Sequence, residues 1–268
     1  MTSSDAEQAI LFGVADHVAT LTLNRPEVRN AVTQAMYARL ADLFRQIQDD
    51  GDIRCVIVTA ADPAFCSGED LRDMRASSAP SAGLSRMHNP RPEPTAAAMA
   101  ILDCDRPIIA AINGPAVGWG TELALLADIR IASEQASFAT LFVKRGLIAD
   151  VAGMIKLPRL VGPQKAAEML FTGDRIDARE AEAAGLVLKC VPHAALMSEA
   201  RALAARIAVN APLAVRYTKE ALRRSQGIDE RMLGSWITSV YGRLFQSADH
   251  HEGVASFLEK RPPRFTGR

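Results

Sequence analysis

Two glycine-containing turns in the sequence hold residues that could do chemistry. The first covers residues 64–71 (A-F-C-S-G-E-D-L), the second covers residues 113–123 (N-G-P-A-V-G-W-G-T-E-L), and each follows an apolar run typical of a strand. Each turn leads toward a helix, where the first backbone N–H groups lack intrahelical partners and the helix dipole favours negative charge. The pair could therefore stabilise an anion, although each turn alone is also a common packing joint.

Several other kinds of site do not fit these residues. Neither turn matches the G-x-x-x-x-G-K phosphate loop, nor the G-x-G-x-x-G dinucleotide turn in its usual place. The G-x-S-x-G motif is absent and no histidine lies within the first turn, so the hydroxyl of Ser67 is not predicted to be a nucleophile. The cysteines and histidines form no C-x-x-C or H-E-x-x-H pattern, so we predict no metal site.

The elements that must position these turns alternate between strand and helix patterns. Residues 10–14 and 17–23 predict a hairpin, residues 55–59 a buried strand, and residues 107–112 and 129–131 two further strands. Thr33 is placed to cap a helix whose apolar residues recur at helical spacing. These are Met36, Leu40, Leu43, Phe44 and Ile47. The alternation predicts an α/β fold in which helices cover a sheet.

Two regions depart from this alternation. Residues 76–95 are rich in proline and serine and predict a long loop, either a mobile flap over a pocket or a decorative insertion. Beyond residue 192 the pattern is helical only, with helices expected at residues 194–209, 212–224, 229–247 and 252–260. We place a domain boundary near residue 205, which gives a core of residues 1–205 and a helical region of residues 206–268.

The composition is that of an ordinary globular protein. The 268 residues contain 31 Lys plus Arg and 31 Asp plus Glu, and this balance argues against a general nucleic-acid binder. No apolar run reaches the roughly 18 residues that a membrane span requires. The N-terminus shows no secretory signal pattern, so we expect a cytoplasmic protein with reduced thiols.

The two turns belong to a longer pattern that covers nearly the whole chain. The matching segments are residues 23–26 (L-N-R-P), 30–31, 64–71, 113–124 with Asp128 beyond, 157–162, 171–173, 178–186 and 257–265. On these motifs the chain resembles the crotonase superfamily, the enoyl-CoA hydratase/isomerase family. The resemblance implies an α/β fold with a superhelical (spiral) core of ββα units and a C-terminal α-helical trimerisation region.

The resemblance also implies a joint role for the two turns. In this family two backbone N–H groups face the thioester oxygen of a bound acyl-CoA, and by position we assign them to Ser67 and Trp119. Removing a proton next to a thioester creates an enolate, and preorganised donors in a dry site stabilise its charge. The family often has glycine in place of Trp119, and a backbone N–H can serve whatever the side chain is. For the N–H to reach the thioester oxygen, the indole is expected to lie away from that oxygen. Because the donors are main-chain atoms, Ser67→Ala should matter little.

Glu122 stands at a position that is catalytic in the family. Its other interpretation is a first-turn helix carboxylate that the dipole stabilises. Hydratases of the family pair this glutamate with a second one, four residues after the phenylalanine that corresponds to Phe138, and here that position is Phe142. Phe142, assigned to the acyl pocket, makes the site less hospitable to an ordered water, which needs two to four polar partners. Ordinary hydration is thus in doubt, although Glu122 alone could support a slow version.

Asp150 stands where several isomerases of the superfamily have a catalytic aspartate. Among them are dienoyl-CoA isomerases and the ring-epoxide isomerase of phenylacetyl-CoA breakdown, which also resembles this chain in its phenylalanine at the position of Phe142. An apolar pocket raises the pKa of a carboxylate and so improves it as a base near neutral pH. Asp150 could also be the N-cap of the following helix. The resemblance therefore favours an enoyl-CoA isomerase in which Asp150, or less favourably Glu122, moves the proton.

Further expectations concern coenzyme A and subunits. The residues expected to bind CoA are Arg29, Cys66, Gly68, Asp70, Phe257 and Lys260, the last two reaching a neighbouring subunit's nucleotide. No cofactor is expected beyond the CoA of the substrate, and no nucleic acid or membrane partner. The resemblance implies a homotrimer or a dimer of trimers. Two alternatives stay open, namely a hydratase or other lyase that uses Glu122, and a non-catalytic acyl-CoA-binding protein.

Overall fold

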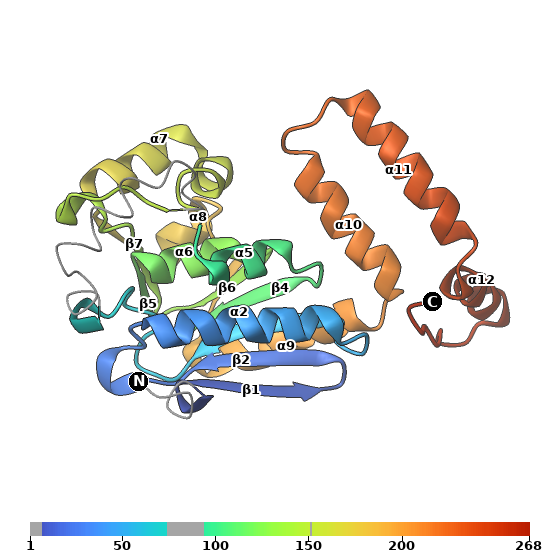
Figure 1. Ribbon diagram of the computed structural model, residues 1–268, viewed down its shortest axis with the longest axis horizontal. Helices are drawn as coiled ribbons and strands as arrows, with labels where there is room; N and C mark the ends of the chain where they lie inside the picture. Colours follow the sequence, from blue (N-terminus) through green and yellow to red (C-terminus); the bar gives the residue numbers. More distant parts are fainter. Residues whose placement is uncertain (1–6, 74–93, 151) are drawn as a thin grey trace.

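The centre of the molecule is a sheet whose strands run in the order β1-β2-β3-β4-β6-β9 (Figure 1). The computed structural model describes residues 7–73, 94–150 and 152–268. The first two strands form the predicted antiparallel hairpin and the others pair in parallel. The strands are β1 (Ile10–Ala15), β2 (Val18–Leu23), β3 (Cys55–Ala60), β4 (Ile108–Ile112), β6 (Ile129–Ser133) and β9 (Lys189–Val191).

Strand β3 explains why the sheet is covered on both faces. All of its residues are buried, and they alternate between two apolar clusters. Cys55 and Ile57 face one cluster, whereas Val56 and Val58 face the other. Because successive side chains of a strand point to opposite faces, a continuous apolar run requires helices on both sides.

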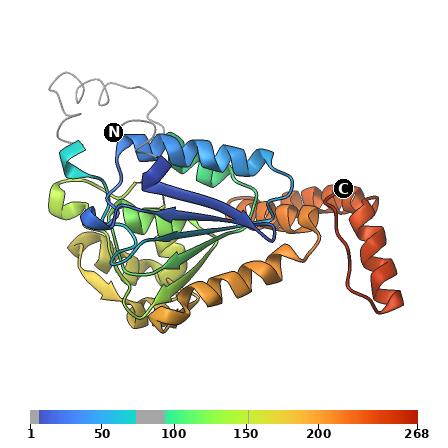
Figure 2. The ribbon, with the colours of Figure 1, turned by 90° about the horizontal axis from the view of Figure 1, so that it is seen from below.

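Three helices supply that cover. Helices α2 (Gln34–Asp49) and α5 (Ala96–Asp103) lie on one face and α9 (Leu196–Ala208) on the other (Figure 2). The predicted cap of α2 is confirmed, since the Thr33 hydroxyl accepts the Met36 N–H at 3.3 Å.

A second, smaller sheet has the order β5-β7-β8 and carries one of the glycine turns at its edge. Its strands are β5 (Pro115–Val117), β7 (Ser137–Ala139) and β8 (Arg175–Asp177). The remaining core helices are α6 (Trp119–Leu126), α7 (Lys156–Thr172) and α8 (Ala178–Ala183), with 3-10 turns at Pro26–Val28, Val143–Arg145 and His193–Ala195. Helix α6 begins directly after β5, so Trp119 and Glu122 lie in its first turn.

The C-terminal helices leave the sheet and project to one side (Figures 1 and 2). They are α10 (Pro212–Arg224), α11 (Glu230–Phe245) and α12 (Ala248–Glu259). The last begins four residues before the prediction because the Ser247 hydroxyl caps it, accepting the His250 N–H at 3.1 Å.

The predicted domain boundary at residue 205 and the predicted flap at residues 76–95 differ in how far the structure describes them. The expected boundary at residue 205 falls inside α9, whose Ala204 and Ala208 are both buried against the core. The predicted flap at residues 76–95 lies almost entirely outside the described residues. In the part of the chain that the structure describes, no helix combines the length and the apolar character needed to cross a bilayer.

Candidate active site

The two glycine turns lie against each other, although about fifty residues separate them in the sequence. The Cys66 N–H donates to the Pro115 carbonyl at 3.1 Å, and the Val117 N–H donates to the Cys66 carbonyl at 2.8 Å. A Cβ on Gly120 would lie 2.1 Å from the Cys66 carbonyl oxygen, so only glycine allows this approach. The close backbone contact brings the residues after Cys66 next to the start of α6.

The prediction that the Ser67 amide is an oxyanion donor is wrong. The Ser67 N–H donates to the Arg29 carbonyl at 3.0 Å, so it is already engaged. Arg29 can accept it because the turn after Pro26–Val28 puts Arg29 in the left-handed region, at φ 54°. The bond holds the first turn against the segment before α2, which is a structural role.

Two nearby amides remain unengaged. The Val32 N–H donates to the Gly68 carbonyl, and the Asp70 N–H donates to the Val32 carbonyl, each at 2.9 Å. This pairing directs the Glu69 N–H away from Val32. Among the described residues, neither the Glu69 N–H nor the Trp119 N–H has an acceptor. A Cβ built on Gly68 would lie 3.6 Å from the Trp119 nitrogen, so the chain just before Glu69 passes beside that amide.

The indole of Trp119 is turned into the protein. Trp119 is only 4 % exposed, and its ring meets the ring of Tyr37 edge to face with centroids 4.7 Å apart. The bulky side chain therefore packs against α2, and the backbone N–H at the start of α6 is left open.

Glu122 is a buried carboxylate held by main-chain donors from another segment. The Ala152 N–H donates to Oε2 at 2.7 Å, and the Gly153 N–H lies 2.9 Å from Oε2 and 3.1 Å from Oε1. Burial raises the pKa of the Glu122 carboxyl, the Gly153 and Ala152 donors lower it, and the charge of Asp150 raises it. Both oxygens are thus engaged by backbone groups outside the glutamate's own helix.

Asp150 is exposed and lies close enough to Glu122 for the two charges to interact. Its carboxylate has no hydrogen-bond or ion-pair partner among the described residues, and partial burial of this side chain raises its pKa. The N-cap prediction for Asp150 is wrong, because the next helix, α7, begins after Ile155. Asp150 is therefore a free carboxylate beside a fixed one.

Phe142 begins the short turn at Val143–Arg145 and is half-buried. Apolar side chains from neighbouring loops are exposed around the same part of the chain. They are Val143, Leu147, Ile148, Met154 and Ile155. Phe142 contributes an apolar ring, which has no group that can hold a water.

The residues expected to bind CoA differ in which of their side-chain and backbone groups lack internal partners. Arg29 is exposed next to the first turn. Asp70 pairs with Arg25 at 3.1 Å, and both backbone groups of Cys66 are used by β5. Cys66 is fully buried, which raises the pKa of its thiol to about 12. The Gly68 carbonyl accepts the Val32 N–H. Arg29 thus has a free side chain, whereas Asp70 and Cys66 mainly hold the turn.

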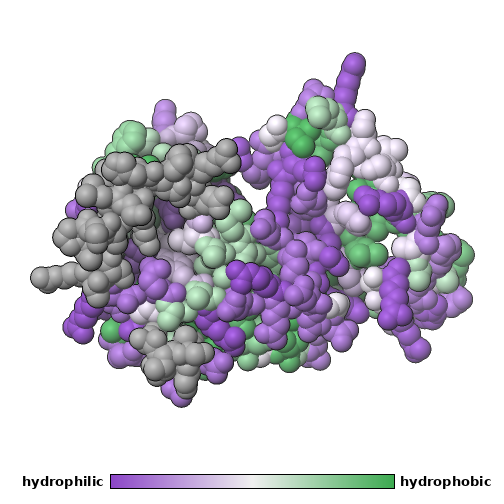
Figure 3. Space-filling model, in the orientation of Figure 1, coloured by the Kyte–Doolittle hydropathy of each residue, from purple (hydrophilic) through white to green (hydrophobic). Residues whose placement is uncertain are grey.

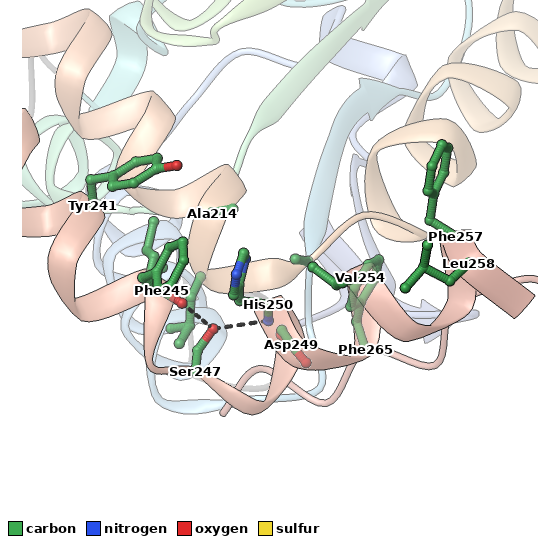
Figure 4. Close-up of a pocket in the computed structure, with 14 residues that line it drawn as sticks. Ala214, Tyr241, Phe245, Ser247, Asp249, His250, Val254, Phe257, Leu258 and Phe265 are labelled. Atoms are coloured by element: carbon green, nitrogen blue, oxygen red, sulfur yellow. Dashed lines mark hydrogen bonds between the residues drawn. The ribbon is translucent and has the colours of Figure 1, made fainter.

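Phe257 and Lys260 lie at the other end of the molecule from this site, on and just after α12 (Figure 1). Phe257 is 82 % exposed and borders an apolar cavity of about 560 Å³ between the C-terminal helices. Figure 4 shows Tyr241, Phe245 and His250 at one end of this cavity and Phe257 with Leu258 at the other. Apolar side chains also emerge among polar ones over these helices in Figure 3.

Two residues at the site were missed by the sequence analysis. Glu69 directly follows Gly68, and the signal for it was present in the same motif, but choosing among consecutive amides requires knowing which are paired. Tyr37 gave no signal, because it follows Met36 in an ordinary amphipathic helix. Its hydroxyl donates to Glu69 Oε1 at 3.3 Å.

Comparisons with known proteins agree on one family. The family model described as enoyl-CoA hydratase/isomerase matches residues 13–268. A probable enoyl-CoA hydratase of Rhodobacter capsulatus is 38 % identical over 97 % of this chain and 98 % of its own. The 1,2-epoxyphenylacetyl-CoA isomerase of Escherichia coli is 36 % identical over the same shares. The crystal structure of an enoyl-CoA hydratase from Bacillus anthracis superposes with a TM-score of 0.89 at 35 % identity, covering 97 % of this chain and 100 % of that one.

Proposed function

Because the chain belongs to the enoyl-CoA hydratase/isomerase family, we propose that it is an enoyl-CoA isomerase that shifts a double bond along an acyl-CoA thioester. The substrate is a β,γ-enoyl-CoA and the product is its α,β isomer. The reaction passes through a dienolate whose negative charge lies on the thioester oxygen.

The oxyanion is held by the amides of Glu69 and Trp119. Both N–H groups lack acceptors among the described residues, and the close approach of Gly68 to the Trp119 nitrogen supports their common direction. Fixed donors in a site closed to water stabilise developing charge without reorganisation. This assignment replaces Ser67, whose amide is bound to Arg29.

Asp150 is the base. Its ionised carboxylate takes a proton from C2 of the acyl chain, and the electron pair of that C–H bond moves through the dienolate. The resulting carboxylic acid returns the proton to C4, so the double bond moves to C2–C3 and no atom is gained or lost. Burial raises the pKa of Asp150, which brings the carboxylate nearer the strength that proton transfer at neutral pH requires.

The contrast between the two carboxylates carries this proposal. Both oxygens of Glu122 are occupied by the Ala152 and Gly153 amides, whereas the carboxylate of Asp150 has no partner among the described residues. Hydration in this family needs two carboxylates to hold and activate a water. With Phe142 in one position and Glu122 engaged in the other, an isomerisation by Asp150 alone fits better.

A panel of enoyl-CoA esters incubated in water labelled with both deuterium and oxygen-18 tests this proposal. An isomerase leaves deuterium in the product without oxygen-18, because the proton on the exposed Asp150 acid exchanges with solvent before it reaches C4. It loses that activity in Asp150→Asn more than in Glu122→Gln. Oxygen-18 in the product supports instead a hydratase that uses Glu122. The Rhodobacter relative is named a probable enoyl-CoA hydratase. Tight binding of the esters with neither label overturns any catalytic role.

We also propose that the active molecule is a homo-oligomer, a trimer or a dimer of trimers. Phe257 and Lys260 lie on and just after α12, at the other end of the molecule from their own chain's glycine turns, which favours their use by a neighbouring subunit (Figure 1). The apolar cavity and exposed rings of α11 and α12 support a buried surface there (Figures 3 and 4). Light scattering gives the assembly directly, and a monomer at micromolar concentration contradicts it.

Proton transfer of this kind needs no redox or metal group. We therefore propose that the enzyme uses no cofactor, since the CoA belongs to the substrate. We also propose a cytoplasmic location.

A further inference from the structure

Tyr37 lies at the junction of α2 with both glycine turns. It is 5 % exposed, in the first turn of α2 after the Thr33 cap. The residue before that cap, Val32, is already paired with the first turn through Gly68 and Asp70. This end of α2 is therefore attached to the first glycine turn, which carries Glu69.

The Tyr37 side chain contacts each of the two residues whose amides form the proposed oxyanion hole. Its hydroxyl donates to Glu69 Oε1 at 3.3 Å. Its ring meets the Trp119 indole at an interplanar angle of 87°, with centroids 4.7 Å apart. The first contact is to one turn and the second is to the other turn, so a single side chain spans the two.

We propose that Tyr37 is a positioning residue that sets the mutual placement of the Glu69 and Trp119 amides. The hydroxyl fixes the Glu69 side chain, and the ring keeps the Trp119 indole out of the space that the thioester oxygen enters. This inference rests on the proposed function.

The chemistry of the phenol agrees with positioning rather than with proton transfer to substrate. Burial raises the pKa of Tyr37, and the charges of Glu69, Cys66 and Asp150 raise it further, so the hydroxyl stays protonated and acts as a donor. Its α2 neighbours Met36, Leu40 and Phe44 fill the core with apolar atoms alone. A packing role at position 37 would need no hydroxyl, whereas an anchor for Glu69 does.

A saturated acyl-CoA labelled with carbon-13 at the thioester carbonyl measures the effect directly. Hydrogen bonds from the two amides polarise the carbonyl and displace its NMR resonance when the ester binds. We expect the wild-type displacement to shrink in Tyr37→Phe, with a loss of about tenfold in kcat and less than about twofold change in KM. Tyr37→Leu, which also removes the ring contact, should lose more.

Glu69 variants and a matched tyrosine serve as controls. Glu69→Gln keeps an oxygen that can accept from Tyr37, so it should displace the resonance more than Glu69→Ala does. Glu69→Ala should match Tyr37→Phe, and the double variant should be no worse than either single change, because both remove one interaction. Tyr217 meets Trp236 edge to face between α10 and α11, with centroids 6.4 Å apart, and Tyr217→Phe should leave the resonance unchanged.

The outcomes distinguish a failure of the Tyr37 role from a failure of the proposed oxyanion hole. If wild type displaces the resonance and Tyr37→Phe, folded by circular dichroism, displaces it equally at full kcat, Tyr37 is a core residue and the inference is wrong. If the wild-type resonance does not move on binding, the proposed oxyanion hole is wrong and this inference with it.

Discussion

The carboxylate of Glu122 occupies space that exists because residue 153 is glycine. A Cβ at Gly153 would lie 2.4 Å from Glu122 Oε1 and 2.8 Å from the Ala149 side chain. The same residue donates its N–H to the carboxylate. The absence of a side chain and the presence of a donor therefore act together to fix one acidic group beside the free acid of Asp150.

Gly153→Ala should destabilise the protein by about 2 kcal/mol, because an added methyl group in a filled site forces its neighbours apart. Denaturant unfolding measures this change. Gly234→Ala in α11 is the control, since a Cβ there meets nothing within 4 Å. The control should be neutral or slightly stabilising through helix propensity. Equal stability of Gly153→Ala and wild type would contradict the tight fit.

The rate should depend on pH through the ionisation of Asp150. A base must be ionised, and burial raises the pKa of this carboxyl, so activity should fall as pH drops through a value above that of an ordinary aspartate. The profile of kcat/KM against pH measures it. In Glu122→Gln the neighbouring charge is lost, and the acidic limb should move to lower pH. A limb that stays in place would show that the two carboxylates do not interact.

The choice between the Ser67 and Glu69 amides can be tested by replacing each peptide N–H with an ester oxygen through semisynthesis. At Glu69 the replacement should lower kcat about a hundredfold with little effect on folding, as expected for loss of one oxyanion donor. At Ser67 it removes the bond to the Arg29 carbonyl, so it should cost stability instead. The reverse pattern would restore the Ser67 assignment.

Phe142→Glu should raise hydration relative to isomerisation, because it adds a second carboxylate where a water would be held. Incorporation of oxygen-18 from labelled water measures this ratio. Phe142→Leu keeps an apolar side chain and serves as the control. No oxygen incorporation in a folded Phe142→Glu would mean that the ring at this position is not what prevents hydration.

Lys156 should make stability rise with pH in mildly alkaline solution. Burial lowers the pKa of its amine from 10.5 to about 8, although the amine donates to the Leu126 carbonyl at 3.0 Å. Between these values the unfolded chain binds more protons than the folded one, so the free energy of unfolding increases with pH, on the order of 1 to 3 kcal/mol. Urea unfolding at about pH 7 and about pH 10 checks this. Lys156→Gln should flatten the dependence, and an unchanged slope would contradict it.

Much of the architecture could be predicted because its causes are local in the chain. The apolar run of β3 requires cover on both faces, and the Thr33 hydroxyl caps α2 by accepting an N–H only three residues ahead. Helix α12 begins at Ala248, four residues before the predicted start, because Ser247 caps it. The family pattern located both glycine turns, Glu122, Asp150 and the phenylalanine at position 142, since each belongs to a motif of fixed spacing.

The order and spacing of the motifs specify which segments carry the site and which residue types stand in them. Folding selects the groups that are free to act. Ser67 is engaged by Arg29, and Glu122 by Ala152 and Gly153, through contacts between segments about thirty or more residues apart. Tyr37 reaches both turns from a helix whose pattern marks only its buried face. A backbone amide has the same chemistry at every position, so only the pairing of distant segments determines which amides remain open to a substrate.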